Sequence, residues 1–261
     1  MLIDTHVHYS KSNFDCGREE IIERLRDAGI KVIETAIGYE SNEKVLRLCK
    51  ANSDMMRAVL GCHPNCVGDM TEARWTELVN RIRNNQYVVA IGETGLDYSR
   101  ALKLEERKLQ RLWFDRYIEL SKMMNKPLVI HCRGEGAYDD LYKVLLDHEM
   151  HDRTDCPGVI HCFSGSEEDI NRFGDLGFYF GVGGLFLKDE ELKKSISSMP
   201  LERLLLETDS PYLLPTELAG KRNTSLNLPY IIGKLSEQWR IDVQCIVEAA
   251  NKNAVTVFGE W

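Results

Sequence analysis

The segment Leu2-Ile-Asp-Thr-His-Val-His8 is a short, largely apolar and β-branched run that ends on two histidines. Because side chains alternate along a strand, this run predicts that Asp4, His6 and His8 share one face. Seven further apolar runs follow along the chain, and several of them also end on polar residues. The eight predicted strands are Leu2–His8, Lys31–Ile37, Met56–His63, Tyr87–Glu93, Pro127–Arg133, Gly158–Phe163, Phe178–Gly183 and Arg203–Asp209.

Helical periodicity fills the stretches between these runs. The predicted helices are Arg18–Ala28, Asn42–Ala51, Glu72–Asn84, Leu104–Met124, Asp139–His148, Glu167–Leu176, Glu190–Ser198, Leu228–Trp239 and Asp242–Phe258. Four of them begin near a residue that favours helix N-termini, namely Ser41, Thr71, Ser166 and Asp189.

Eight strand–helix units in succession are compatible with a closed barrel or with an open doubly wound sheet. An open sheet usually carries a glycine-rich phosphate loop after its first strand. Here Gly17 comes nine residues after His8, and no such loop is present. We therefore predict an α/β fold, a (β/α)8 TIM barrel in which residues 1–261 form a single domain.

Composition narrows the classes of function. A net charge of −8 argues against a protein that coats long duplexes. It leaves open an enzyme that takes one nucleic-acid end into a pocket where bound cations supply positive charge. The first residues lack the pattern of a signal peptide, and no segment approaches the roughly 18 apolar residues of a membrane span. We expect a cytoplasmic protein with eight reduced cysteines, although Cys62 and Cys66 around His63 are a weak zinc signal.

Polar side chains gather at the C-terminal ends of the predicted strands, where barrel enzymes carry their active sites. Five of the seven histidines lie there, whereas His148 and His151 are expected to be solvated. Taken singly, His63, Glu207 and Arg133 have ordinary structural interpretations. Taken together, four histidines and two carboxylates exceed one tetrahedral shell and fit a pair of divalent cations. The strand-end residues are His6, His8, His63, Glu93, His131, Arg133, His161, Glu207 and Asp209.

Six motifs occur in order: His6-Val-His8, Gly61-Cys-His-Pro64, Ile91-Gly-Glu-Thr-Gly-Leu-Asp-Tyr98, Ile130-His-Cys-Arg133, His161-Cys-Phe-Ser-Gly165 and Glu207-Thr-Asp-Ser-Pro-Tyr-Leu213. With them the chain resembles the TatD-type metal-dependent deoxyribonuclease family of the amidohydrolase superfamily, from about its second residue to its end. The resemblance implies two metal sites: one formed by His6, His8 and Asp209, the other by His131 and His161, with Glu93 bridging them. It also implies that His63 lies near the bound water or the substrate phosphate.

Two loop segments depart from the family pattern. Arg222-Asn223 matches only half of an Arg-Asn-x-Pro element, and Gly134–Asp139 differs from the usual continuation after Arg133. Both departures concern substrate preference more than chemistry.

The leading hypothesis is a deoxyribonuclease that removes nucleotides from single-stranded DNA ends, with 3′–5′ polarity implied by the resemblance. Its cofactors would be two divalent ions (Mg, Mn or Zn), since imidazoles favour Zn, Mn or Fe and the family implies Mg. Glu93, Asp209 and His63 would be catalytic. Arg133 and Arg222 would contact phosphates, whereas the further cations Lys188 and Lys221 are more simply interpreted as solvated.

Two alternatives remain open. One is a small-molecule amidohydrolase, a deacylase or lactonase with the same metals. The other is a metal-stabilised binding protein without activity, against which the intact set of ligands counts. Neither membrane binding nor extended duplex binding is expected.

Overall fold

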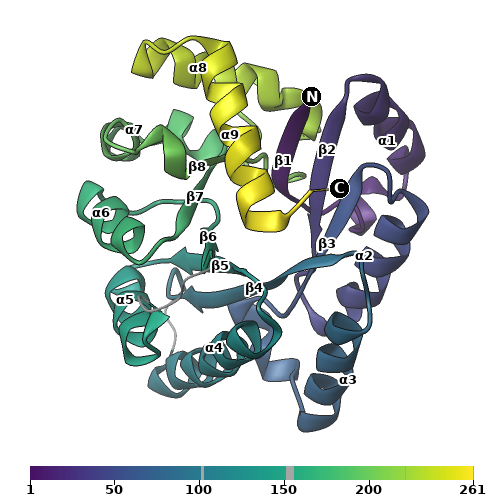
Figure 1. The fold of residues 1–261 in the computed structure, drawn as a ribbon, viewed down its shortest axis with the longest axis vertical. Coiled ribbons are helices and arrows are strands. Elements are labelled where there is room, and N and C mark those ends of the chain that lie inside the picture. Colours follow the sequence, from purple (N-terminus) through teal and green to yellow (C-terminus); the bar gives the residue numbers. More distant parts are fainter. Residues whose placement is uncertain (101–102, 151–155, 221, 261) are drawn as a thin grey trace.

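The computed structural model describes residues 1–100, 103–150, 156–220 and 222–260. Eight parallel strands pair in sequential order from β1 to β8, with the helices around them (Figure 1). The predicted α/β barrel is therefore confirmed. The strands are β1 (Leu2–Val7), β2 (Ile30–Thr35), β3 (Met56–Leu60), β4 (Val88–Asp97), β5 (Leu128–Arg133), β6 (Gly158–Ile160), β7 (Tyr179–Val182) and β8 (Leu204–Leu206).

The residues that follow β8 close the ring against β1. Val7 forms a parallel bridge with Ser210, and the His8 amide donates to the Ser210 carbonyl at 2.8 Å. The Asp209 amide donates to the His6 carbonyl at 3.0 Å. These bonds bring the two ends of the barrel sequence together, so that residues of β1 and of the segment after β8 share one site.

The helices agree closely with the periodicity of the sequence. They are α1 (Arg18–Asp27), α2 (Tyr39–Ala51), α3 (Glu72–Arg83), α4 (Leu104–Met124), α5 (Ala137–Asp147), α6 (Glu167–Asp175), α7 (Glu190–Ile196), α8 (Leu228–Trp239) and α9 (Val243–Phe258). Thr71, Ser166 and Asp189 cap their helices as predicted. Ser41 does not, because α2 begins at Tyr39, after Gly38, and the Ser41 hydroxyl accepts the Gly38 amide at 3.0 Å.

One apolar side chain from each strand fills the interior of the barrel near the N-terminal ends of the strands. This cluster contains Ile3, Ile33, Val59, Ala90, Val129, Val159, Tyr179 and Leu205. Ala254, Val257 and Phe258 of α9 pack against it, and Figure 1 shows α9 lying in front of the ring of strands. A second, larger cluster lies between the strands and the outer helices. Since apolar side chains fill one end of the interior, the other end is left for polar residues.

The alternation of side chains predicted for the first strand is wrong at Asp4. Ile3 belongs to the inner cluster, and the pairing of β1 with β2 slips by one residue between Asp4 and Val7. Asp4 therefore lies on the outer face, where its carboxylate accepts the Thr208 amide at 3.0 Å and the Thr208 hydroxyl at 2.6 Å. His6 lies within the slip, and His8 comes after it.

A similar irregularity turns Glu93 inward. In a regular strand Ile91 and Glu93 would share a face, but Ala90 belongs to the inner cluster and Ile91 packs in the outer one. The pairing of β4 with β5 slips between Gly92 and Thr94, so that Glu93 is the extra residue of a bulge.

Candidate metal centre

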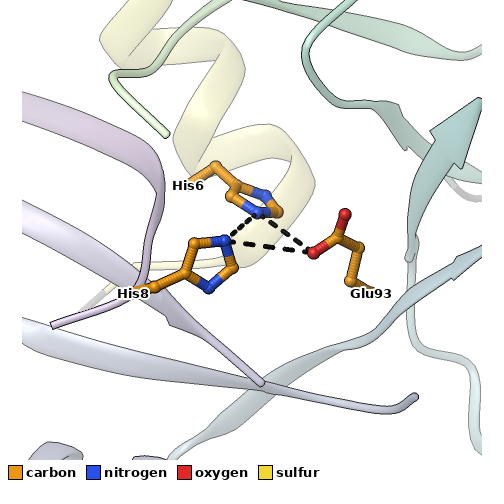
Figure 2. A group of neighbouring side chains, drawn as sticks. All are labelled: His6, His8 and Glu93. Carbon is orange, nitrogen blue, oxygen red and sulfur yellow. Dashed lines mark hydrogen bonds and ion pairs between the residues drawn. The ribbon is translucent and has the colours of Figure 1, made fainter. Parts of the chain in front are cut away.

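Two histidines and a carboxylate meet at the C-terminal end of β1. The Nε2 atoms of His6 and His8 lie 3.2 Å apart, and they are 3.5 and 4.0 Å from Oε2 of Glu93 (Figure 2). His8 Nδ1 lies 2.8 Å from the Thr35 carbonyl, to which it must donate, so in the neutral ring its Nε2 carries the lone pair that faces the cluster. Oδ1 of Asp209 lies 3.2 Å from that same Nε2. These four side chains therefore point their donor atoms at one region.

The other oxygen of Glu93 faces a second pair of histidines. Oε1 lies 2.9 Å from His131 Nδ1 and 2.8 Å from His161 Nε2, and these two nitrogens are 3.3 Å apart. His63 Nε2 is 3.6 Å from the same oxygen. Glu93 is almost completely buried, so each of its oxygens is surrounded by imidazoles rather than by water. The two oxygens of the Glu93 carboxylate thus face two different groups of histidine nitrogens.

The electrostatics of this cluster favour positive charge. Burial raises the pKa of the Glu93 carboxyl, but the surrounding imidazoles, His161 and His63 first, outweigh burial and hold that pKa well below its usual range. Burial would lower the pKa of His161, yet Glu93 and Glu207 raise it well above the ordinary value. Burial, with His161 beside it, lowers the pKa of His6. Neighbouring histidines thus differ in their affinity for a proton within one desolvated site.

The donor set fits divalent cations. Two imidazole nitrogens that face each other at 3.2 Å need a shared proton or cation between them. The groups able to hold an ion include His6, His8 and Glu93, and also Glu93, His131 and His161. Imidazole together with carboxylate is the ligand set of Zn, Mn and related ions. Buried carboxylates and imidazoles converge without another compensating charge, which a cation would supply.

Two further carboxylates lie behind the second pair of histidines. Oε1 of Glu207 accepts the Cys162 amide at 2.6 Å and lies 3.7 Å from His161 Nδ1. Oδ2 of Asp97 lies 3.3 Å from His131 Nε2. Carboxylates in this position orient a metal-binding imidazole and increase its basicity.

Asp97 is not among the residues predicted from the sequence, although a signal was present. The predicted strand ends at Glu93, whereas β4 continues through Asp97. Asp97 lies four residues after Glu93, a spacing that keeps the same face in a regular strand. A longer strand prediction would have identified it.

A cavity of about 560 Å³ opens over the cluster. Of the predicted catalytic residues, His63, Glu93 and Asp209 all line it. Three cations, Lys11, Arg100 and Arg133, contribute to its wall, and only Arg133 was predicted.

Arg222 and Asn223 lie elsewhere. The Arg222 guanidinium donates to the Cys16 carbonyl at 2.9 Å and lies over the Phe14 ring, and it does not line the cavity. Asn223 is buried and donates to the Thr208 carbonyl at 2.9 Å. The matching half of the family element therefore supports the segment that carries Asp209.

The remaining predicted residues lie away from the cluster. His148 is not simply solvated, because it lies 2.8 Å from a Glu119 oxygen and 3.0 Å from an Asp115 oxygen. Lys188 ends a short 3-10 helix (Gly184–Lys188) and does not line the cavity. His151 and Lys221 lie outside the described residues.

The cysteine predictions have two outcomes. All eight cysteines are free thiols, as predicted. The weak zinc signal of Cys62 and Cys66 finds no support, since in the described part of the chain no group with metal-ligand geometry includes a cysteine. Among the described helices, none is long and apolar enough to cross a membrane.

A parallel barrel with a histidine–carboxylate cluster at the C-terminal ends of its strands defines a metal-dependent hydrolase of the amidohydrolase superfamily. The TatD related DNase family matches residues 3–259, and the chain belongs to this family.

Relatives of known name agree with this assignment. The chain is 29% identical over 266 residues to the 3′-5′ ssDNA/RNA exonuclease TatD of Pantoea ananatis, with 99% of each chain covered. It is 30% identical over 264 residues to the uncharacterized metal-dependent hydrolase YabD of Bacillus subtilis, again with 99% of each covered. The crystal structure of the TatD homolog YjjV from Escherichia coli superposes with a TM-score of 0.88 at 29% identity, covering 100% of this chain and 98% of that one.

Proposed function

We propose that this chain is a two-metal phosphodiesterase that removes nucleotides from single-stranded DNA ends in the 3′ to 5′ direction. The proposal rests on the position of the Glu93 carboxylate. Its Oε2 faces His6 and His8, while its Oε1 faces His131 and His161. The residues that would hold the ions are His6, His8 and Asp209 for one, His131 and His161 for the other, and Glu93 for both. Bound ions would lower the pKa of a water molecule and stabilise the charge that develops during phosphodiester displacement.

His63 is suited to hold a phosphate oxygen. Its Nδ1 accepts the Asn65 amide at 3.0 Å, so the proton of the neutral ring is on Nε2. Burial lowers the pKa of His63 to about 4, and the ring is therefore neutral near pH 7. Because His63 lines the cavity, its Nε2–H is a hydrogen-bond donor for the substrate that does not repel a cation.

Asp209 supplies an ionised carboxylate to the site. Burial raises the pKa of its carboxyl, but His8 outweighs burial and the pKa is lowered overall. Asp209 therefore stays ionised near pH 7 at the cavity wall. A carboxylate in this position can take the proton of an attacking water in the transition state.

Three features support a nucleic-acid end as the substrate. Among the described residues Lys11, Arg100 and Arg133 form no salt bridge, so the cavity wall offers three cations to phosphates. A volume of about 560 Å³ is that of a small-molecule site and suits one strand end better than a continuous duplex. The relative from Pantoea ananatis is named as an exonuclease on single strands.

A substrate panel with the metal-loaded protein tests the proposal. Linear single-stranded DNA labelled at the 3′ or the 5′ end should be shortened from its 3′ end, and a circle of the same sequence should remain intact. Glu93→Gln should abolish turnover even with metal in excess, whereas the exposed Glu202→Gln should match the wild type.

Three results would contradict parts of the proposal. Cleavage of the circle would refute the requirement for an end. Normal turnover by Glu93→Gln would refute the two-metal mechanism. Hydrolysis of N-acyl amino acids or lactones, with no action on DNA or on a chromogenic phosphodiester, would identify a small-molecule amidohydrolase instead.

A further inference from the structure

Tyr212 is an exposed aromatic side chain on a fixed backbone. It lies at the wall of the cavity of about 560 Å³ over the candidate metal ligands, here called the metal cavity. Tyr212 is 41% exposed, and it lines the cavity. Its amide donates to the Asp209 carbonyl at 2.8 Å, and its own carbonyl accepts the side-chain amide of the buried Asn223. The ring is therefore presented to the cavity by backbone that is anchored at both its amide and its carbonyl.

A lysine and a candidate metal ligand flank this ring. Lys11 Nζ lies 5.1 Å from the centroid of the Tyr212 ring, within the range of a cation–π contact. The His8 ring meets the Tyr212 ring edge to face, with centroids 5.9 Å apart. In the described part of the chain Lys11 has no carboxylate partner within salt-bridge distance. The candidate metal ligand His8, the aromatic ring of Tyr212 and the ammonium group of Lys11 thus lie next to one another.

Resting on the proposed function, we infer that Tyr212 and Lys11 form a subsite for one unpaired nucleotide of the substrate. The base stacks on the Tyr212 ring, and Lys11 leaves the ring to contact a neighbouring phosphate. Every base has an aromatic face, so stacking binds all four bases and gives no sequence preference. In a duplex both faces of a base are covered by its neighbours, and the subsite therefore favours unpaired ends. The flexible four-carbon stem of lysine allows the exchange between ring and phosphate.

The chain contains a matched control for this pair. Lys234 Nζ lies 5.8 Å from the Tyr230 ring centroid on α8, and neither residue lines the metal cavity. Tyr230→Ala therefore removes the same side chain from the same kind of contact without touching the proposed subsite.

Base-free oligonucleotides test the role of Tyr212. Single-stranded substrates carry one tetrahydrofuran residue, which has no base, at each of the last three positions in turn, and kcat/KM is measured for each. For the wild type, loss of the stacked base should lower kcat/KM roughly 5- to 150-fold at one position, the effect of removing one stacking contact. Tyr212→Ala should cleave the intact strand more slowly and show no further loss at that position. Tyr212→Phe and Tyr230→Ala should discriminate as the wild type does.

Binding measured without turnover separates the contribution of Lys11 from that of Tyr212. Anisotropy of a labelled oligo-dT in the presence of EDTA measures affinity across a salt series. Lys11→Ala should lower the salt slope by about 0.7, the value for one phosphate contact on a single strand, and keep the discrimination against the base-free substrate. Retained discrimination by Tyr212→Ala, or an unchanged salt slope for Lys11→Ala, would overturn the subsite. If the wild type neither binds nor cleaves the intact strand, the proposed function fails, and the subsite fails with it.

Discussion

Replacing Glu207 with glutamine should weaken one of the two proposed metal-binding events more than the other. The Glu207 side chain is buried, and its Oε1 lies 3.7 Å from His161 Nδ1, the ring nitrogen that does not face Glu93. Glutamine has nearly the same shape and keeps an oxygen for the Cys162 amide, which Glu207 accepts at 2.6 Å. What the substitution removes is the negative charge behind His161.

The expected magnitude follows from this geometry. Removal of a carboxylate partner of a metal-binding histidine lowers affinity about 10- to 100-fold. This corresponds to about 1.4 to 2.8 kcal/mol of binding free energy. His161 Nε2 faces Oε1 of Glu93 together with His131, whereas His6 and His8 face the other oxygen. A donor atom of His6 also lies within 4.8 Å of a Glu207 oxygen, but His6 keeps its Nε2 towards His8 and Oε2 of Glu93. The ion proposed to bind His131 and His161 should therefore lose more affinity than the other.

Competition with a chromogenic chelator resolves the two events, and each dissociation constant is compared between wild type and variant. Asp169→Asn is the matched control, because it also neutralises a buried carboxylate that accepts a backbone amide, on α6 and away from the cluster. The reasoning is refuted if both dissociation constants of Glu207→Gln stay within about twofold of the wild type. It is equally refuted if both weaken to the same extent. Turnover of Glu207→Gln should recover when metal is added in excess.

Three further predictions concern stability and the surroundings of the site. Chelation should lower the melting temperature reversibly, because free metal at 100 times its Kd stabilises the fold by about 2.7 kcal/mol per site; an unchanged melting temperature after chelation would contradict a metal centre. Gly61→Ala should lower the free energy of unfolding, measured with urea, by about 1–3 kcal/mol, because a Cβ there would lie 2.5 Å from the Gly92 carbonyl group. Gly68→Ala, where a Cβ meets nothing within 4 Å, is its control, and equal stabilities would show that the backbone adjusts. His148→Ala should keep full turnover and lose no more than about 1 kcal/mol of stability, since its carboxylate partners lie on the protein surface; a drop in kcat would place His148 in the reaction.

The order of helices and strands could be predicted from local sequence patterns. Predicted helices Leu104–Met124 and Leu228–Trp239 coincide with α4 and α8. Apolar periodicity determines these boundaries, because each helix must bury one face against the strands. The order of strands and helices then implies a parallel barrel, and a parallel barrel gathers all C-terminal strand ends at one mouth.

The same logic predicts that the candidate metal ligands meet, from their positions at strand ends alone. His131 and His161 lie at the ends of neighbouring apolar runs of the sequence, and their ring nitrogens are 3.3 Å apart in the folded chain. Local sequence could not indicate that Arg222 turns to the Cys16 carbonyl instead of the cavity. That contact joins residues 206 positions apart, and it exists only because the segment after β8 closes against β1.

The sequence by itself therefore determined the class of fold, the end of the barrel that carries the chemistry, and the residue types gathered there. Only the tertiary structure decided the facing of individual side chains. The strand pairing slips between Asp4 and Val7, so that Asp4 does not share a face with the histidines, and it slips again at Glu93, which turns that side chain inward. Such a slip depends on which backbone groups of the neighbouring strand are available for hydrogen bonds, and that strand lies tens of residues away in the sequence. For the same reason the division of the two Glu93 oxygens between two pairs of histidines became visible only in the closed barrel.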